Sequence, residues 1–366
     1  MAGWAVYYLL VSVASPFIGR WVDRYGARRV IFTGALTGAL GFILLSLLDN
    51  LWQFYVGYAV VGVAMAAVGY IPTSAVVSNW FKKRRGTAIG VMSAGIGAGG
   101  PALAPLIGGY LIPNFGWKVS YLALAIIVCL IVVPLALFVI KTRPADMGLY
   151  PDGVEAPEAV DVTEAPLVAS HGLTLKMALI TPAFWLIAVS FLSSTFSHVG
   201  ILQNQVPHLE DIGFPVAMVA TAFGGLGLAS AIGKFGFGWL CDRIPAKYAC
   251  AIGLGLQVVG IIILMAIGPA SSLTIIWLYA IIMGLGVGSW LPTLSMLTSS
   301  NFGLVAYGAI FGALALAMGI GNTSGPVVAG YMYDIMGSYH WAFITLLALY
   351  AVAIPTILAV RRPKSL

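Results

Sequence analysis

Residues 19–29 read GRWVDRYGARR, a stretch with five charged side chains in eleven residues. The chain around it is strongly apolar, with 60% hydrophobic residues, 44 glycines and only 8% charged residues. Its mean hydropathy of +0.99 lies outside the range of soluble domains. Charge crowded into so short a segment of such a chain indicates a polar connection between two membrane spans.

Long apolar runs lie on both sides of this stretch, and each is long enough to cross the hydrocarbon of a bilayer as a helix. None alternates polar and apolar residues as the strands of a membrane barrel would. The sequence therefore predicts an all-α membrane protein. The eleven predicted spans lie near residues 2–20, 30–48, 51–79, 87–112, 119–140, 178–203, 214–238, 248–268, 271–298, 304–331 and 340–360.

The basic residues predict the orientation of the spans. Sixteen of the 18 lysines and arginines lie in every second connection, and cytoplasmic connections are the ones that retain such residues. Residues 19–29 are then a cytoplasmic loop, the C-terminus is cytoplasmic, and the net charge of +6 needs no nucleic-acid partner. For most basic loops, anchoring of the topology is a sufficient explanation.

Two halves of the chain repeat one another. Gly19 to Arg24 recurs as Gly238 to Arg243, with the aspartates Asp23 and Asp242 at the same place. Three further echoes follow in the same order at nearly the same offset, namely Tyr70-Ile-Pro-Thr as Trp290-Leu-Pro-Thr, Gly100-Pro101 as Gly325-Pro326, and Trp117 as Trp341. This pattern indicates a duplication, with a five-span bundle at 1–140, an acidic solvated linker at 141–176 and a six-helix bundle at 177–366.

The two halves differ by one span. The first span of the second half, near residue 178, has no counterpart after Met1. We expect a gene start that lies further upstream, and a chain that lacks this helix is the alternative.

The stretch GRWVDRYGARR resembles the signature loop between the second and third helices of the major facilitator superfamily. Asn79 to Gly86, Phe115 to Lys118 and Arg143 to Gly153 are similar to segments of its monocarboxylate and oxalate/formate transporter branch. The resemblance covers the chain apart from the first helix of the family. It implies a major facilitator fold, with two pseudo-symmetric helical bundles around a central cavity that opens to each side in turn.

The resemblance also implies a gate. A carboxylate can lie against the positive N-terminus of a neighbouring helix and hold nearby arginines. We expect Asp23 to do this against the span that starts near 304, and Asp242 against the span that starts near Gly86. Arg24, Arg28 and Arg243 complete these two gating clusters, and simple topology anchors are the alternative.

Lys234 is the candidate anion ligand. It lies eight residues before Asp242, roughly 12 Å deeper along a helix, and an intramembrane charge is a functional hypothesis by default. In the transporters that it resembles, an arginine at this spacing engages the substrate carboxylate, whereas a lysine lacks the bidentate fork. A second buried cation of the oxalate transporter has no counterpart in 304–331, which favours a monocarboxylate. A lysine that snorkels to the interface is the alternative.

Three further residues are predicted to line the site. Tyr70 and Trp290 precede prolines at matched positions, and aromatic walls give a cavity shape selectivity. His198 lies in a polar run at the outer end of its span and can carry a proton near neutral pH. Ordinary helix packing for the aromatic pair, and an interfacial polar role for His198, are the alternatives.

No arrangement typical of an enzyme is present. Gly95, Gly97 and Gly100 match a dinucleotide fingerprint formally, but no strand precedes them. The three cysteines show neither metal-ligand nor redox spacing, so we expect no metal and no cofactor.

The sequence therefore predicts a secondary active transporter of small organic anions in the lipid bilayer of a bacterial inner (plasma) membrane, with a coupled proton or counter-anion. A drug or sugar carrier of the same fold is one alternative, and a truncated fragment that does not transport is another.

Overall fold

The computed structural model describes residues 2–153 and 172–363. Within these ranges the chain is helical, and the only bridge of strand type is an isolated one between Gly172 and Gly303. The all-α prediction is confirmed. The first half contains α1 (Ala2–Tyr25), α2 (Ala27–Ser46), α3 (Leu51–Val68), α4 (Tyr70–Trp80), α5 (Arg85–Ala104) and α6 (Ile112–Ile127). The second half contains α7 (Leu175–Ile180), α8 (Pro182–Asp211), α9 (Val216–Cys241), α10 (Ala246–Ala266), α11 (Leu273–Gly288), α12 (Trp290–Phe302), α13 (Tyr307–Met336) and α14 (Tyr339–Leu358).

Nine segments of the described chain are long and apolar enough to cross a bilayer. They coincide with nine of the eleven predicted spans, and α1 and α5 occupy the other two. The protein is therefore an integral, multi-pass membrane protein. The chain turns at Gly116, whose φ of +79° suits glycine, and this residue lies within the predicted connection between the spans 87–112 and 119–140. π-helical turns at Pro105–Leu111 continue α5 toward this turn, and by length and composition 106–139 forms one apolar segment.

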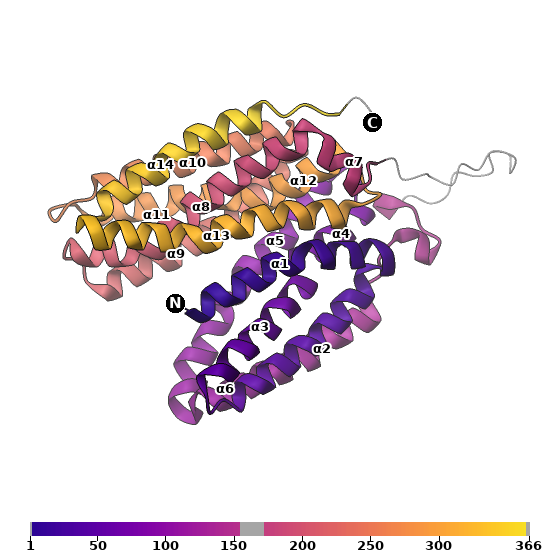
Figure 1. Cartoon of the computed structure of the whole chain (residues 1–366), viewed down its shortest axis with the longest axis horizontal. Coiled ribbons are helices and arrows are strands. Elements are labelled where there is room, and N and C mark those ends of the chain that lie inside the picture. Colours follow the sequence, from indigo (N-terminus) through magenta and orange to yellow (C-terminus); the bar gives the residue numbers. More distant parts are fainter. Residues whose placement is uncertain (1, 154–171, 364–366) are drawn as a thin grey trace, which may run out of the picture.

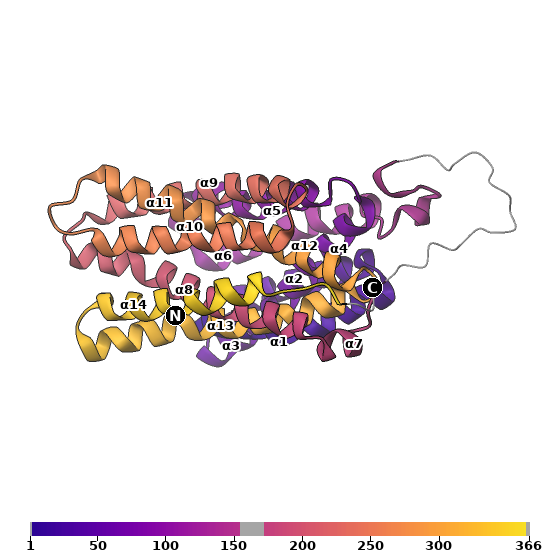
Figure 2. The same ribbon diagram turned by 90° about the horizontal axis from the view of Figure 1, so that it is seen from above.

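The helices form two bundles, α1 to α6 and α8 to α14 (Figure 1). The most extensive contacts between the bundles are those of α1 with α13 and of α5 with α9. The bundles meet at the end where α4 and α7 lie and diverge toward the end where the N-terminus lies (Figure 1). We call the first of these the closed end. The view from above shows that the helices of both bundles run roughly along the long axis of the molecule (Figure 2).

Both halves contain one interrupted helix. Gly69 separates α3 from α4, and Ser289 separates α11 from α12. The breaks lie directly before Tyr70 and Trp290, three residues ahead of Pro72 and Pro292. Proline removes a backbone donor and crowds the preceding turn, so the matched prolines account for matched breaks.

Residues 141–153 of the predicted linker pack on the first bundle, whereas Leu173 near its other end donates its N–H to Phe302 O of the second bundle. Trp80 Nε1 donates to Lys141 O at 2.8 Å, and Asn79 Nδ2 donates to Thr142 O at 3.2 Å. The Asp152 carboxylate accepts the backbone N–H groups of Lys82 and Lys83, both at 3.0 Å. We call residues 141–153 the strap. Residues 154–171 of the predicted linker lie outside the described ranges.

Candidate functional site

Asp23 joins the two bundles at the closed end. It lies in the last turn of α1, and its two carboxylate oxygens accept the N–H groups of Gly308 and Ala309, both at 2.8 Å. These N–H groups belong to the first turn of α13, where no helical carbonyl is available to them. The carboxylate therefore satisfies two orphan donors of the opposite bundle and lies at the positive end of its helix dipole.

Asp242 makes the equivalent contact in the other direction. Its carboxylate accepts the N–H of Gly86 at 2.7 Å, the N–H of Thr87 at 2.8 Å and the Thr87 hydroxyl at 2.6 Å. Gly86 and Thr87 begin α5, so each bundle provides one carboxylate and one helix N-terminus. Both aspartates lie against the helices that the sequence predicted. Their role as a gate stays a prediction.

The strap supports the α5 end of this contact. Asp152 binds the loop directly before α5 through two N–H groups. Desolvation of the carboxylate is outweighed by these two hydrogen bonds, so the pKa of Asp152 lies below its ordinary value. The loop is thus held from one side by Asp152 and from the other by Asp242.

The predicted arginine partners of the gate lie elsewhere. Among the described residues the ion pair found joins Lys118 to Asp49, and neither gate aspartate has one. Arg24 lies over the ring of Tyr25, Arg243 stacks at 3.6 Å on the ring of Trp239, and Arg28 donates to Leu137 O. The expectation that the carboxylates hold these arginines was therefore wrong for this conformation. Main-chain N–H groups of the opposite bundle, and not guanidinium groups, donate to both carboxylates.

Glycines allow the bundles to approach at both contacts. A Cβ atom on Gly19 would lie 1.9 Å from Gly308 O, and one on Gly238 would lie 2.4 Å from Gly86 O. One turn further on, Cβ atoms on Gly312 and Gly90 would lie 2.3 Å from Ser15 O and 2.7 Å from Lys234 O. The two pairs are related by the repeat, because Ser15 and Lys234 differ by the same 219 positions as Asp23 and Asp242. Lys234 is thus the charged member of a matched pair whose other member is Ser15.

Lys234 lies on α9 where that helix crosses α5 of the opposite bundle. Its side chain is partly buried, and the hydrogen bonds and ion pairs found among the described residues leave its ammonium without a partner. The ammonium lies within electrostatic reach of the imidazole of His198 on α8. The structure therefore brings together two of the predicted site residues. A desolvated ammonium without a counter-ion is costly, and an anion would offset that cost.

Tyr70 and Trp290 also meet between the bundles. Their ring centroids are 6.5 Å apart in an edge-on arrangement, and Tyr70 lies 5.8 Å from Phe311 of α13. The aromatic pair therefore joins α4 of one bundle to α12 of the other at the two helix breaks. Broken helices at bundle interfaces are where transporter folds place their sites.

Several buried polar atoms in the described chain have no partner. They include His198 Nδ1, Trp290 Nε1 and Asn322 Oδ1, from α8, α12 and α13. Buried polar groups are nearly always paired, so unpaired ones mark places where water or a ligand is expected. Sequence reasoning missed Asn322. The signal was an amide in an apolar helix four residues before Pro326.

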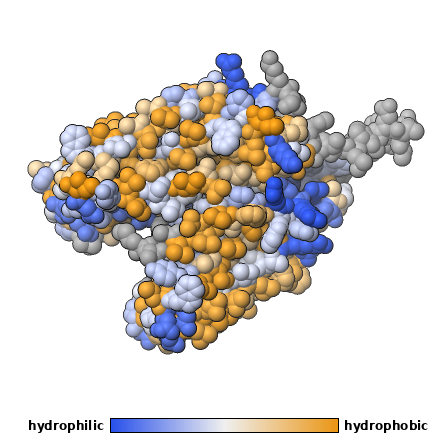
Figure 3. Space-filling view, in the orientation of Figure 1, coloured by the Kyte–Doolittle hydropathy of each residue, from blue (hydrophilic) through white to orange (hydrophobic). Residues whose placement is uncertain are grey.

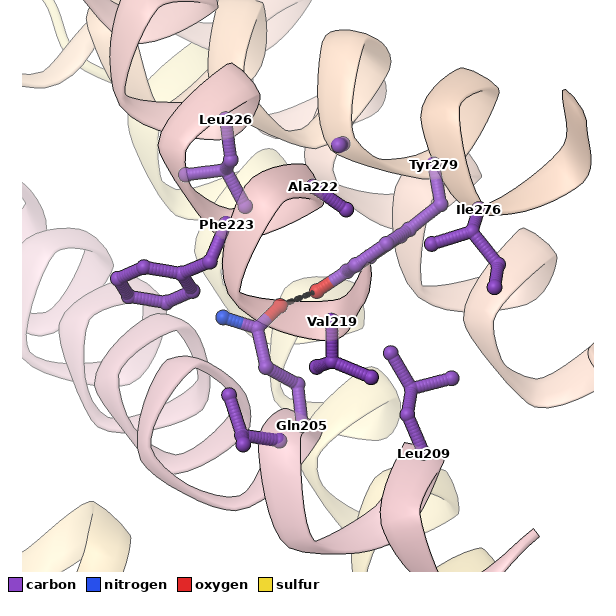
Figure 4. A pocket seen from close by; sticks show the side chains of 10 residues that line it. Gln205, Leu209, Val219, Ala222, Phe223, Leu226, Ile276 and Tyr279 are labelled. Carbon is purple, nitrogen blue, oxygen red and sulfur yellow. Dashed lines mark hydrogen bonds between the residues drawn. The ribbon is translucent and has the colours of Figure 1, made fainter. Parts of the chain in front are cut away.

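One small cavity lies apart from this site. It is enclosed by α8, α9 and α11 within the second bundle, and it has a volume of about 10 Å³ (Figure 4). The hydroxyl of Tyr279 donates to the Gln205 amide oxygen across it. A volume of this size holds about one water molecule, so the cavity is no substrate site.

Comparisons with known proteins agree with this architecture. The family model described as "Major Facilitator Superfamily" matches residues 1–321. The chain is 26% identical over 338 residues to monocarboxylate transporter 13 of Rattus norvegicus, and the alignment covers 90% of this chain and 72% of that protein. It is 26% identical over 364 residues to the multidrug resistance protein MdtG of Enterobacter lignolyticus, and this alignment covers 98% of this chain and 81% of that protein. The solved structure of the Escherichia coli fucose:proton symporter FucP superposes with a TM-score of 0.74 at 15% identity, over 99% of this chain and 90% of that one.

Proposed function

We propose, since the chain belongs to the Major Facilitator Superfamily, that it is a secondary active transporter of small organic anions that works by alternating access. The observation that carries the proposal is the Lys234 ammonium, which lies where two bundles cross and has no partner found among the described residues. In a water-poor site an anion is the ligand that this group favours most.

The surrounding groups favour a carboxylate. Trp290 Nε1 is an unpaired donor, and His198 can donate from a ring nitrogen. One ammonium with a few neutral donors matches one carboxylate, because a second negative charge would have no cation of its own. We therefore infer a monocarboxylate in preference to a dicarboxylate. The name of the rat relative is consistent with this substrate class.

The divergence of the bundles supports the proposal of alternating access. The halves meet at the closed end through Asp23 and Asp242 and separate toward the other end (Figure 1). The basic loops lie at the closed end, which we assign to the cytoplasm of a bacterial inner membrane, with the C-terminus on that side. On this assignment the bundles diverge toward the outside (Figure 1). Release inside requires both carboxylates to leave the opposing helix ends.

A coupled ion completes the proposal. His198 lies within electrostatic reach of Lys234 and has a buried ring nitrogen without a partner, so we assign it the exchange of a proton as substrate binds. Proton symport and exchange against a counter-anion are both compatible with this arrangement, and the dependence of uptake on an imposed pH gradient distinguishes them.

Uptake into proteoliposomes tests the substrate class. With labelled lactate, formate and oxalate, we expect saturable uptake of the two monocarboxylates and weaker uptake of oxalate. A carrier of drugs or sugars is the second candidate, since the relatives and structural neighbours include MdtG and FucP. Labelled fucose and a cationic dye therefore serve as comparison substrates. Transport of either one, with no transport of the three acids, would refute the anion proposal.

We call the contacts of Asp23 and Asp242 with the opposing helix N-termini the two latches. Loss of one latch carboxylate is expected to open the closed end. In an Asp23→Asn variant, one oxygen and the negative charge that face Gly308 and Ala309 are lost. A reporter cysteine at Ser15, which is fully buried one to two turns behind the latch, should then react several-fold faster with a membrane-impermeant thiol reagent in inside-out vesicles. Exposed Cys129 is replaced by serine to remove background.

Asp146→Asn is the matched control, because Asp146 is an exposed aspartate of the strap whose carboxylate accepts the N–H of Arg143. Equal labelling rates in the Asp23 variant, the control and the parent would leave Asp23 without a gating role.

A further inference from the structure

A charged hollow lies at the closed end, away from Lys234. It has a volume of about 360 Å³ and lies between the connection of α1 with α2 and the strap. Thr142 of the strap lies close to Gly26 of that connection, because a Cβ on Gly26 would lie 2.9 Å from the Thr142 hydroxyl. The charged residues that line the hollow are Asp23, Arg24, Arg28, Arg29, Arg143 and Asp146.

The two carboxylates of the hollow are already engaged by backbone donors. Asp23 accepts two N–H groups of α13, and Asp146 accepts the N–H of Arg143. None of the four arginines forms an ion pair found in the described part of the chain. Four guanidinium groups and two carboxylates leave the lining with an excess of two positive charges, which favours an anion in the hollow. The planar guanidinium fork matches the oxygens of a phosphate group.

The edges of the hollow are apolar and exposed. Trp21 and Tyr25 at the end of α1 are 54% and 48% exposed, and Phe138 and Val139 just before the strap are 76% and 66% exposed. Exposed aromatic side chains at the ends of spans mark the level of lipid headgroups. Hydrophilic residues gather on the surface at this same end, next to apolar flanks (Figure 3). A ligand with a phosphate and an apolar tail would contact both kinds of surface.

We propose that the hollow binds the headgroup phosphate of an anionic phospholipid, whose acyl chains lie along the exposed side chains of α1 and of the segment before the strap. The site is separate from the proposed transport site and does not depend on the identity of the substrate. Basic clusters directly beside spans attract anionic lipids, and this hollow adds a defined place for one headgroup.

Lipid retention in nanodiscs tests the proposal. The variant combines Arg29→Gln with Arg143→Gln, and the matched control combines Lys82→Gln with Arg84→Gln, which removes two positive charges from the neighbouring loop. Proteins are reconstituted with phosphatidylglycerol or with phosphatidylcholine, and retained lipids are counted by native mass spectrometry. We expect the parent and the control to retain one phosphatidylglycerol molecule, and the variant to retain at least fivefold less. A variant that combines Arg29→Lys with Arg143→Lys should retain an intermediate amount of phosphatidylglycerol, since it keeps both positive charges but loses the planar guanidinium groups.

The following outcomes would overturn the proposal. Equal loss of phosphatidylglycerol in the variant and the control would show that only the general positive charge of this surface attracts the lipid. Equal retention of phosphatidylcholine by the parent would show that the hollow does not select an anionic headgroup. Displacement of the lipid by millimolar inorganic phosphate would assign the hollow to the free anion. Folding is checked independently by the melting temperature, which should stay unchanged because no hydrogen bond or ion pair found among the described residues uses the side chain of Arg29 or Arg143.

Discussion

Valine in place of Gly238 is expected to keep the closed end from closing and to reduce uptake to background. A Cβ at this position would lie 2.4 Å from Gly86 O and 2.7 Å from the Cα of Gly90. Both are backbone atoms of α5, so no flexible side chain can move aside, and α5 as a whole would have to retreat from α9. Retreat would also separate Asp242 from the N–H groups that it accepts. The carrier should then remain open to the cytoplasm.

The measurement combines uptake with cysteine labelling. The Ser15→Cys reporter should react rapidly from the cytoplasmic side in the Gly238→Val protein, while membrane insertion is retained. Gly236→Val is the control, since it lies on the same helix and its Cβ would meet nothing within 4 Å. Parental uptake by the Gly238 variant would show that the closed end of this structure is not visited during transport.

Substitution of Lys234 by glutamine is expected to weaken anion transport strongly without loss of the protein from the membrane. A charged hydrogen bond contributes about 1.5–3 kcal/mol. Because each 1.4 kcal/mol is a factor of ten, the apparent affinity for lactate or formate should fall roughly 10- to 150-fold. The concentration dependence of uptake, normalised to the amount of inserted protein, measures the effect.

Two further variants identify the cause. Lys234→Arg keeps the charge and should restore a substantial part of the uptake, while Lys118→Gln removes a positive charge from an exposed ion pair and should change little. If the half-saturation concentration of the Lys234→Gln protein equals that of the parent, Lys234 does not bind the anion, and its side chain extends to the membrane interface instead. The anion proposal would then lose its main support.

Much of the fold follows from local properties of the sequence. Span positions depend on the length of apolar runs, and the two helix breaks depend on Pro72 and Pro292, each of which acts within a turn of its own position. The contacts of Asp23 and Asp242 could be predicted because the repeat and the family resemblance together supply long-range information. The turn at Gly116 lies in the predicted connection between the spans 87–112 and 119–140, but the residue at which the chain turns could not be predicted, since its positive φ leaves no mark on hydropathy.

The details of the site depended on tertiary neighbours. The arginines near both aspartates suggested ion pairs, yet the N–H groups of α5 and α13 occupy the carboxylates first. The composition of 141–176 predicts a solvated linker, and residues 145–151 of the strap are exposed. The hydrogen bonds that hold the strap to α4 and to the loop before α5 are tertiary contacts, which composition does not predict. Asn322 is conspicuous only once its amide oxygen is seen to be buried without a donor.

The pairing of Lys234 with Ser15 has a consequence for the transport cycle. The repeat gives both bundles the same crossing geometry, but only the second bundle carries a fixed charge at the crossing. Under the proposed function, an anion held by Lys234 would move together with the second bundle, and the first bundle would move past it without offering a charged ligand. The anion would not have to pass from a ligand in one bundle to a ligand in the other during the cycle. The change between the two conformations would then depend on breaking and re-forming the contacts at the closed end, and not on moving the bound anion.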